Sequence, residues 1–182
     1  MKILVKSRSW VKSQLNNNPE WHMNKWIISI YSSDSQSPFL PRYNILQLNF
    51  DDVSERDVSF GWNIHENSNN AIFFNEYHAK EINKFISEIN VLSDKIMYIH
   101  CDAGISRSGA VGYVLNEYFN KSLFDNKEDY HFFKVNNPHI MPNPLVVRIL
   151  KNELFGVPFA NIEVNDYEYD EEGNKIDHIK LI

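Results

Sequence analysis

Short apolar runs separated by polar segments form the clearest pattern along the chain. Residues 26–31 and 43–50 are apolar or β-branched runs with polar boundaries, and each predicts a strand. A weaker alternation at 2–6 and an apolar run at 95–100 predict two more strands, and residues 9–15 predict a helical turn. The strands are therefore spread along the chain instead of being grouped together.

Longer segments between and after these strands have helical spacing. From Asn75 onward, apolar residues recur every three or four positions, which predicts a helix, and a second helix is predicted over 108–120. Asn143 and Pro144 suit the N-cap and the first position of a third helix, and Gly156 suits its end. Strands thus alternate with helices.

This alternation predicts an α/β fold with a central, mostly parallel sheet flanked by helices. In such folds ligands bind at the carboxyl ends of the strands. The length predicts a single domain over residues 1–160. Residues 161–182 are an acidic C-terminal extension, for which a hairpin and a flexible tail are alternative predictions. The polar segment 53–75 predicts a long functional or mobile loop.

Composition narrows the classes of function. A net charge of −6 and a pI near 5.6 argue against nucleic acid as a partner. No apolar run has the length of a membrane span, so we expect no membrane partner. The histidines have no metal-ligand spacing, so we expect no metal and no cofactor.

A single cysteine fits a reducing compartment, and we expect a cytoplasmic protein, or one inside the host cell if it is viral. The sequence leaves the oligomeric state unknown.

The single cysteine, Cys101, stands between the predicted strand at 95–100 and the predicted helix at 108–120, in a turn that contains Gly104 and Arg107. Such a loop can turn backbone N–H groups inward at a helix N-terminus and bind an anion. The Arg107 guanidinium can grip two phosphate oxygens, and the same positive field favours the thiolate of Cys101. The pattern predicts a nucleophile for phosphate chemistry. A small buried core cysteine is the alternative, but it gives no reason for the arginine.

The residues that we expect to bind the phosphate group of the substrate all follow the cysteine. They are Asp102, Ala103, Gly104, Ile105, Ser106 and Arg107. Gly104 allows backbone torsions and a close oxyanion approach that a side chain would obstruct.

Residues 100–108 resemble the extended signature His-Cys-x2-Gly-x2-Arg-Ser/Thr of cysteine-dependent protein tyrosine phosphatases. The string is most similar to that of the compact dual-specificity branch with its bacterial and viral relatives. The resemblance implies the phosphatase fold, a phosphocysteine intermediate, and no cofactor. It also implies that Ser108 donates a hydrogen bond to the leaving sulfur and that His100 orients the loop. Pro142 and Asn143 resemble a Pro-Asn segment that follows the signature in this branch.

The resemblance further implies a general-acid aspartate after a strand that precedes the cysteine strand. Asp51 and Asp52 follow the predicted strand at 43–50, and we predict that Asp52 is the acid, with Asp51 as the alternative. A pair of turn-capping carboxylates is the structural alternative. Weaker candidates lie in the long loop, at Glu55, Asp57 and Glu66.

The predicted catalytic set is therefore Cys101, Arg107, Asp52 and Ser108, and the predicted activity is hydrolysis of phosphotyrosine in a phosphorylated protein. Phosphoserine and phosphothreonine are further candidate substrates, because the tyrosine-binding loop of the large classical enzymes has no counterpart here. A phosphoinositide substrate and a phosphate-binding module without turnover remain alternatives. Trp62 and His65 are candidates for a lid over the site.

Overall fold

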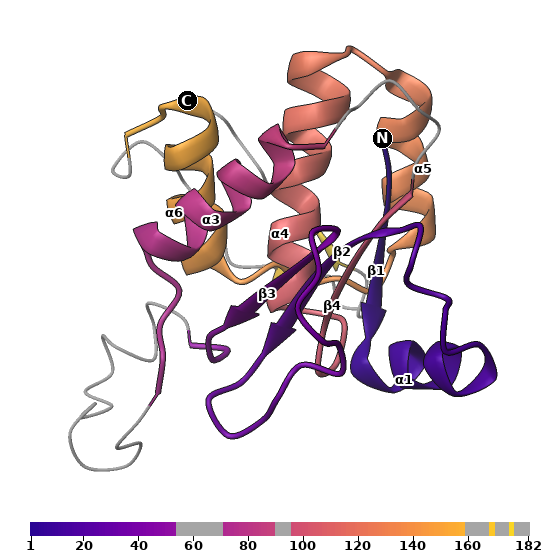
Figure 1. Ribbon diagram of the computed structural model, residues 1–182. Helices are drawn as coiled ribbons and strands as arrows, with labels where there is room; N and C mark the ends of the chain where they lie inside the picture. The colour runs from indigo at the N-terminus through magenta and orange to yellow at the C-terminus, as the bar shows by residue number, and fades with distance from the viewer. Residues whose placement is uncertain (54–70, 90–95, 159–167, 170–174, 177–182) are drawn as a thin grey trace.

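The central element of the computed structural model is a four-stranded sheet in the order β1-β4-β2-β3, with every neighbouring pair parallel. Figure 1 shows this sheet with helices packed around it. The structure describes residues 1–53, 71–89, 96–158, 168–169 and 175–176. The predicted α/β class with a parallel sheet is confirmed. The strands are β1 (Lys2–Ser7), β2 (Trp26–Tyr31), β3 (Ile45–Asn49) and β4 (Ile96–Cys101).

Helices follow the strands and cover both faces of the sheet (Figure 1). They are α1 (Arg8–Asn17), α3 (Glu76–Ser87), α4 (Arg107–Asn116), the π-helix η1 (Glu117–Leu123), α5 (Lys127–Asn136) and α6 (Pro144–Phe155).

The larger core lies between the sheet and helices α3 to α6, and it includes Ile28, Met97 and Ile99. A smaller core lies under α1 on the opposite face, where Ile27 and Tyr98 point. This alternation along β2 and β4 follows from the two-residue period of a strand.

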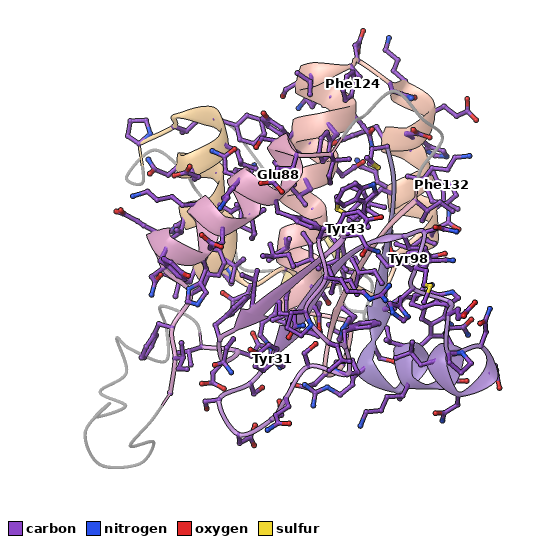
Figure 2. The ribbon with its side chains drawn as sticks, in the orientation of Figure 1. Tyr31, Tyr43, Glu88, Tyr98, Phe124 and Phe132 are labelled. Atoms are coloured by element: carbon purple, nitrogen blue, oxygen red, sulfur yellow. The ribbon has the colours of Figure 1, made fainter. Side chains whose placement is uncertain are left out.

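An aromatic cluster attaches α1 to the smaller core. The Tyr98 ring on β4, labelled in Figure 2, stacks on Trp10 at 5.8 Å between ring centroids and meets Trp21 edge-on at 5.0 Å. Such pairs stabilise beyond their buried area. The cluster therefore fixes the start of α1 beside the carboxyl end of β1, where the candidate site lies.

The predicted caps of the last helix are confirmed. The side chain of Asn143 accepts a hydrogen bond from the Val146 N–H, and Pro144 occupies the first turn of α6. Gly156 ends the helix with a φ of +64°, in the left-handed region that favours glycine. The capping residues in the sequence therefore predicted both ends of α6.

Two helical features were not predicted from the sequence. Helix α5 was missed because Phe133 is its one fully buried side chain, so it has little of the apolar periodicity that marks an amphipathic helix. The single helix predicted over 108–120 was wrong at its C-terminal end, because α4 ends at Asn116 and continues as the π-helix η1. A period of 3.6 residues does not reveal the wider turns of a π-helix.

Several predictions fall on residues outside the described ranges. The proposed lid residues Trp62 and His65 lie there, as do the weaker acid candidates Glu55, Asp57 and Glu66. In the acidic extension, β5 (Glu168–Tyr169) and β6 (Lys175–Ile176) pair antiparallel. Among the described residues, no helix is both long and apolar enough to span a bilayer.

Candidate functional site

The loop 102–106 connects the end of β4 to the start of α4, at the carboxyl edge of the sheet. Cys101 is the last residue of β4, and it lies opposite Ser7 in the register with β1. Gly104 has a φ of +77°, and a Cβ there would stand 2.6 Å from the Lys6 carbonyl carbon and from the Ser7 nitrogen. Glycine is therefore required both for the left-handed turn and for the close approach of the loop to β1.

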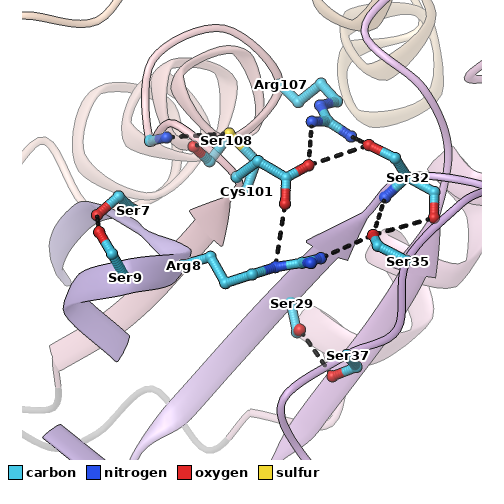
Figure 3. Close-up of polar contacts among 12 residues, drawn as sticks. Ser7, Arg8, Ser9, Ser29, Ser32, Ser35, Ser37, Cys101, Arg107 and Ser108 are labelled. Atoms are coloured by element: carbon cyan, nitrogen blue, oxygen red, sulfur yellow. Dashed lines mark hydrogen bonds and ion pairs between the residues drawn. The ribbon is translucent and has the colours of Figure 1, made fainter. Parts of the chain in front are cut away.

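The sulfur of Cys101 faces this loop, although the residue is 2% exposed. Its Sγ accepts a hydrogen bond from the Gly104 N–H at 3.3 Å and lies 3.0 Å from the Ser108 Oγ. Figure 3 shows Cys101 and Ser108 side by side, at the start of α4. Two donor groups in contact with the sulfur can stabilise a thiolate and also a departing sulfur anion.

The start of α4 lacks a side-chain cap. Ser106 occupies the N-cap position, but its hydroxyl makes no capping hydrogen bond. The Ser106 Oγ instead donates to the Asp52 Oδ1 at 2.7 Å. The first N–H groups of a helix need acceptors and favour negative charge. The start of α4 is thus free of the usual internal acceptor and suits an anion.

Arg107, which is 5% exposed, directs most of its donors into the protein. Its Nη1 donates to the Ser32 Oγ at 2.7 Å and to the Phe50 carbonyl at 2.9 Å, and its Nη2 donates to the Asp102 Oδ2 at 2.7 Å. The buried Nε has no hydrogen-bond partner among the described residues. A buried donor without an acceptor is costly and unusual. This N–H group therefore indicates a binding position for an external anion.

The two candidate acids have different surroundings. Both Asp51 oxygens accept backbone N–H groups, Oδ1 from Ser33 at 3.0 Å and Oδ2 from Ile72 at 2.8 Å. Asp52 is exposed, and its Oδ1 accepts from Ser106 at 2.7 Å and from the Asn143 Nδ2 at 2.9 Å. Asp51 therefore joins backbone segments, whereas Asp52 contacts the loop that follows the cysteine.

The loop is also held by the segment before α6. The Met141 N–H donates to the Ile105 carbonyl at 3.2 Å, and the Asn143 N–H donates to the Ser106 carbonyl at 3.3 Å. The Asn143 side chain reaches the Val53 carbonyl at 3.2 Å in addition to Asp52. The segment that resembled a Pro-Asn motif thus joins Asp52 and Val53, which follow β3, to the cysteine loop.

His100 cannot supply a proton or a base to a ligand, because it is fully buried in β4 and packs against Phe39 at 5.8 Å between ring centroids. Burial, opposed by the backbone of Cys101, lowers the pKa of His100 from 6.5 to about 4. The ring is therefore neutral at physiological pH.

Arg8 and Ser32 also belong to the site, although no sequence pattern pointed to them. Arg8 opens α1, and its Nε lies 3.0 Å from the Asp102 Oδ1, while the Ser32 Oγ donates to the Asp102 Oδ2 at 3.0 Å (Figure 3). Burial raises the pKa of Asp102, but the hydrogen bonds from Arg107 and Ser32 and the Arg8 charge outweigh it, and the pKa falls below 3.8. Asp102 is therefore an anion. Its carboxylate binds cations of the protein itself, and the predicted binding of the substrate phosphate by loop residues 102–107 stays a prediction.

The remaining predicted binding residues lie along the loop. Ala103 is exposed, Ile105 is partly exposed, and Gly104 is buried against β1. Among the described residues, no cluster of His, Cys, Asp or Glu side chains could hold a metal ion. The described geometry provides a sulfur, an uncapped helix start, an arginine donor and a nearby carboxylate.

Comparisons with known proteins give structural neighbours only. No family model and no curated protein matches the chain. Solved structures that it resembles include the human tyrosine phosphatase-like serine/threonine/tyrosine-interacting protein, with a TM-score of 0.48, 20% identity, and coverage of 82% of this chain and 89% of that one. Human DUSP28 has a TM-score of 0.48, 15% identity, and coverage of 85% and 88%. PTPMT1 in complex with PI(5)P has a TM-score of 0.43, 13% identity, and coverage of 85% and 91%.

At 13–20% identity, these neighbours are similar to the chain in fold.

Proposed function

We propose that this protein is a cysteine-dependent phosphatase that hydrolyses phosphate monoesters through a phosphocysteine intermediate. The observation that carries the proposal is the buried Arg107 Nε, which has no acceptor among the described residues and lies in the same turn as Cys101. An oxyanion bound there would also meet the uncapped N-terminus of α4. The sulfur, the guanidinium and the helix start together support a phosphate site that contains its own nucleophile.

In the first step, the Cys101 thiolate attacks phosphorus, and the bond from phosphorus to the ester oxygen breaks. Asp52 in its acid form gives its proton to that oxygen as the alcohol or phenol leaves. In the second step, water attacks the phosphocysteine while the Asp52 carboxylate accepts a proton from the water. The phosphorus–sulfur bond breaks, inorganic phosphate forms, and the thiolate is restored with Ser108 as its hydrogen-bond donor.

We propose a phosphorylated protein as the substrate, with phosphotyrosine first and phosphoserine and phosphothreonine as further candidates. Asp102 and Ala103 precede the glycine of the loop and Ile105 follows it, and none of the three carries a positive charge for a polyphosphorylated headgroup. A phosphoinositide substrate is therefore the second candidate. The thiolate chemistry also fits the reducing, cytoplasmic location that we propose.

Replacement of the nucleophile tests the proposal. We expect Cys101→Ser to lower kcat for p-nitrophenyl phosphate by about a thousandfold or more, because the hydroxyl is a much weaker nucleophile than a thiolate. The variant should keep the melting temperature of the wild type and should still bind orthovanadate or inorganic phosphate. Turnover by Cys101→Ser at a rate near that of the wild type would contradict the mechanism.

A second variant distinguishes a phosphatase from a module that binds phosphate without turnover. Asp52→Asn keeps the acceptor oxygen for Ser106 but removes the transferable proton, and we expect kcat to fall by about a hundredfold to ten-thousandfold. Phosphate affinity should be retained. Asp51→Asn is the matched control, because Asp51 binds backbone N–H groups instead of the loop. A wild-type protein that binds phosphate but hydrolyses no ester in a panel of phosphopeptides and phosphoinositides would favour the binding module.

A further inference from the structure

We propose that Asp102 is a positioning residue for Arg107, with Arg8 as its second cation. In this arrangement, Asp102 and Ser32 hold the guanidinium by its Nη end and leave the Nε side for the phosphate group. The inference rests on the proposed function, since it explains how the phosphate-binding donor is kept in place.

The contacts of Arg107 support this assignment. Its Nη1 and Nη2 bond to Ser32 and Asp102 respectively, and the Ser32 hydroxyl bonds to the same Asp102 oxygen at 3.0 Å. These three groups form a closed ring of hydrogen bonds around one end of the planar guanidinium (Figure 3). Because the guanidinium is rigid, fixing this end also fixes the direction of the Nε–H group. The buried Nε–H, which has no hydrogen-bond partner among the described residues, lies at the other end of the guanidinium from this ring.

Arg8 explains how an anion can stand beside an anion-binding site. Its Nε lies 3.0 Å from Asp102 Oδ1, so the carboxylate is shared between two guanidinium groups. The three charges of Arg8, Asp102 and Arg107 sum to one positive charge. The triad can therefore orient Arg107 while the local field stays favourable for a phosphate group.

The position of Arg8 is itself fixed by the fold. Its backbone N–H donates to the Asp102 carbonyl at 3.1 Å, and its Nη2 donates to the Ser35 Oγ at 2.9 Å. The backbone contact would remain after a change of either side chain. Substitution of the Asp102 side chain should therefore alter the direction of Arg107 without removing the contact between α1 and the loop.

Asp102→Asn tests the assignment, with Asp34→Asn as the matched control. Asp34 is an exposed carboxylate in the same segment as Ser32 and Ser35, so its change alters the net charge equally. For Asp102→Asn we expect the Kd of inorganic phosphate, measured by calorimetry, to rise by about tenfold to a hundredfold, because a misplaced donor loses much of its effect. The kcat/KM for p-nitrophenyl phosphate should fall by a similar factor. Asp34→Asn should change neither quantity.

Equal or tighter phosphate binding by Asp102→Asn would overturn the inference, because it would mean that the carboxylate only repels the ligand. Thermal unfolding of each variant shows whether the fold is intact. A functional phosphatase whose Asp102→Asn variant binds phosphate normally would leave the proposed function in place. A wild-type protein that hydrolyses no phosphate ester would refute the proposed function, whereas the calorimetry would still test the role of Asp102.

A double-mutant cycle with Arg8→Gln gives a second test. The single Arg8→Gln variant should weaken phosphate binding, because it removes the second cation from Asp102. In the Asp102→Asn background the same change should have little further effect, since the two residues act through one contact. Fully additive effects of Arg8→Gln and Asp102→Asn on phosphate affinity would contradict a shared positioning role.

Discussion

Asn143 shows how one side chain can serve both the site and a helix. Its Nδ2 donates to Asp52 at 2.9 Å, and its Oδ1 accepts the Val146 N–H as the cap of α6. The residue is 4% exposed. Because one amide provides a donor and an acceptor, it connects the candidate acid to the first turn of a helix. A change at this position should therefore have a catalytic and a structural component that can be separated.

We expect Asn143→Ala to lower kcat by releasing Asp52 and to destabilise the protein by about 1 kcal/mol by removing the cap. Asn143→Ser restores an acceptor for the helix but does not place an amide donor on Asp52. It should regain most of the stability, measured by urea unfolding, and little of the activity. Full recovery of kcat in Asn143→Ser would show that Asp52 does not depend on the amide.

Because His100 is buried, we expect the free energy of unfolding of the protein to depend on pH. Its pKa is 6.5 when unfolded and about 4 in the folded protein, so the unfolded chain binds a proton in this range and the folded chain does not. The free energy of unfolding should fall as the pH decreases from 6.5 to 4, by up to about 3 kcal/mol from this group. Burial also lowers the pKa of His78, which adds an effect of the same sign.

The measurement is urea unfolding at a series of pH values between 4 and 7 for the wild type and for His100→Phe. The variant should have a flatter profile than the wild type. An unchanged slope in His100→Phe would show that the ring is protonated in the folded state.

At the scale of elements, a buried ion pair joins the π-helix η1 to α6. The Lys151 Nζ lies 2.7 Å from Glu117, the first residue of η1, and both side chains are almost fully buried. The Tyr113 hydroxyl donates to the same carboxylate at 3.1 Å, and the Lys151 Nζ lies 5.1 Å from the Tyr113 ring centroid. These contacts satisfy both charges in an environment where an unpaired charge is costly.

We expect Lys151→Met to destabilise the protein by about 3–5 kcal/mol, because Glu117 would be left as a buried charge without its partner. The double variant Lys151→Met, Glu117→Gln should recover part of the loss. The exposed pair Lys80–Glu76 on α3, at 3.6 Å, provides the control. Lys80→Met should have little effect on the melting temperature. Equal effects of the two lysine changes would contradict the role of the buried pair.

At the scale of the whole molecule, the outer edge of the sheet at β1 is partly closed by the side chain of Asn137, the residue that caps the C-terminus of α5. The Asn137 Oδ1 accepts the Val5 N–H at 2.7 Å, and its Nδ2 donates to the Ile3 carbonyl at 3.2 Å. An amide side chain here takes the place of a neighbouring strand. Open strand edges promote pairing between molecules, so this contact also protects the edge.

Asn137→Ala should destabilise the protein by about 2 kcal/mol, because the buried Val5 N–H would lose its acceptor. Asn136→Ala is the matched control, since that exposed side chain donates to the Phe132 carbonyl within α5. Chemical unfolding measures the difference, and light scattering shows whether the variant associates. A loss no larger than that of Asn136→Ala would contradict the proposed role of Asn137.

The sequence predicted those features that depend on neighbouring residues. The spacing of Cys101, Gly104 and Arg107 identified the loop between β4 and α4, and the order of strands and helices predicted the parallel sheet. Arg8 and Ser32 could not be found in this way, because Ser32 meets Arg107 across 75 positions in the sequence. The separate environments of Asp51 and Asp52 also depend on contacts with distant segments. Long-range contacts of this kind leave no local pattern in a single sequence.

The central claim is that phosphate is transferred to Cys101 during turnover. The most direct measurement is rapid-quench mass spectrometry of the full chain mixed with p-nitrophenyl phosphate, followed by peptide mapping. The account predicts one phosphoryl group on Cys101, with accumulation in Asp52→Asn if water attack becomes slow. Steady turnover with no phosphate on Cys101, or with the phosphoryl group on another residue, would contradict it.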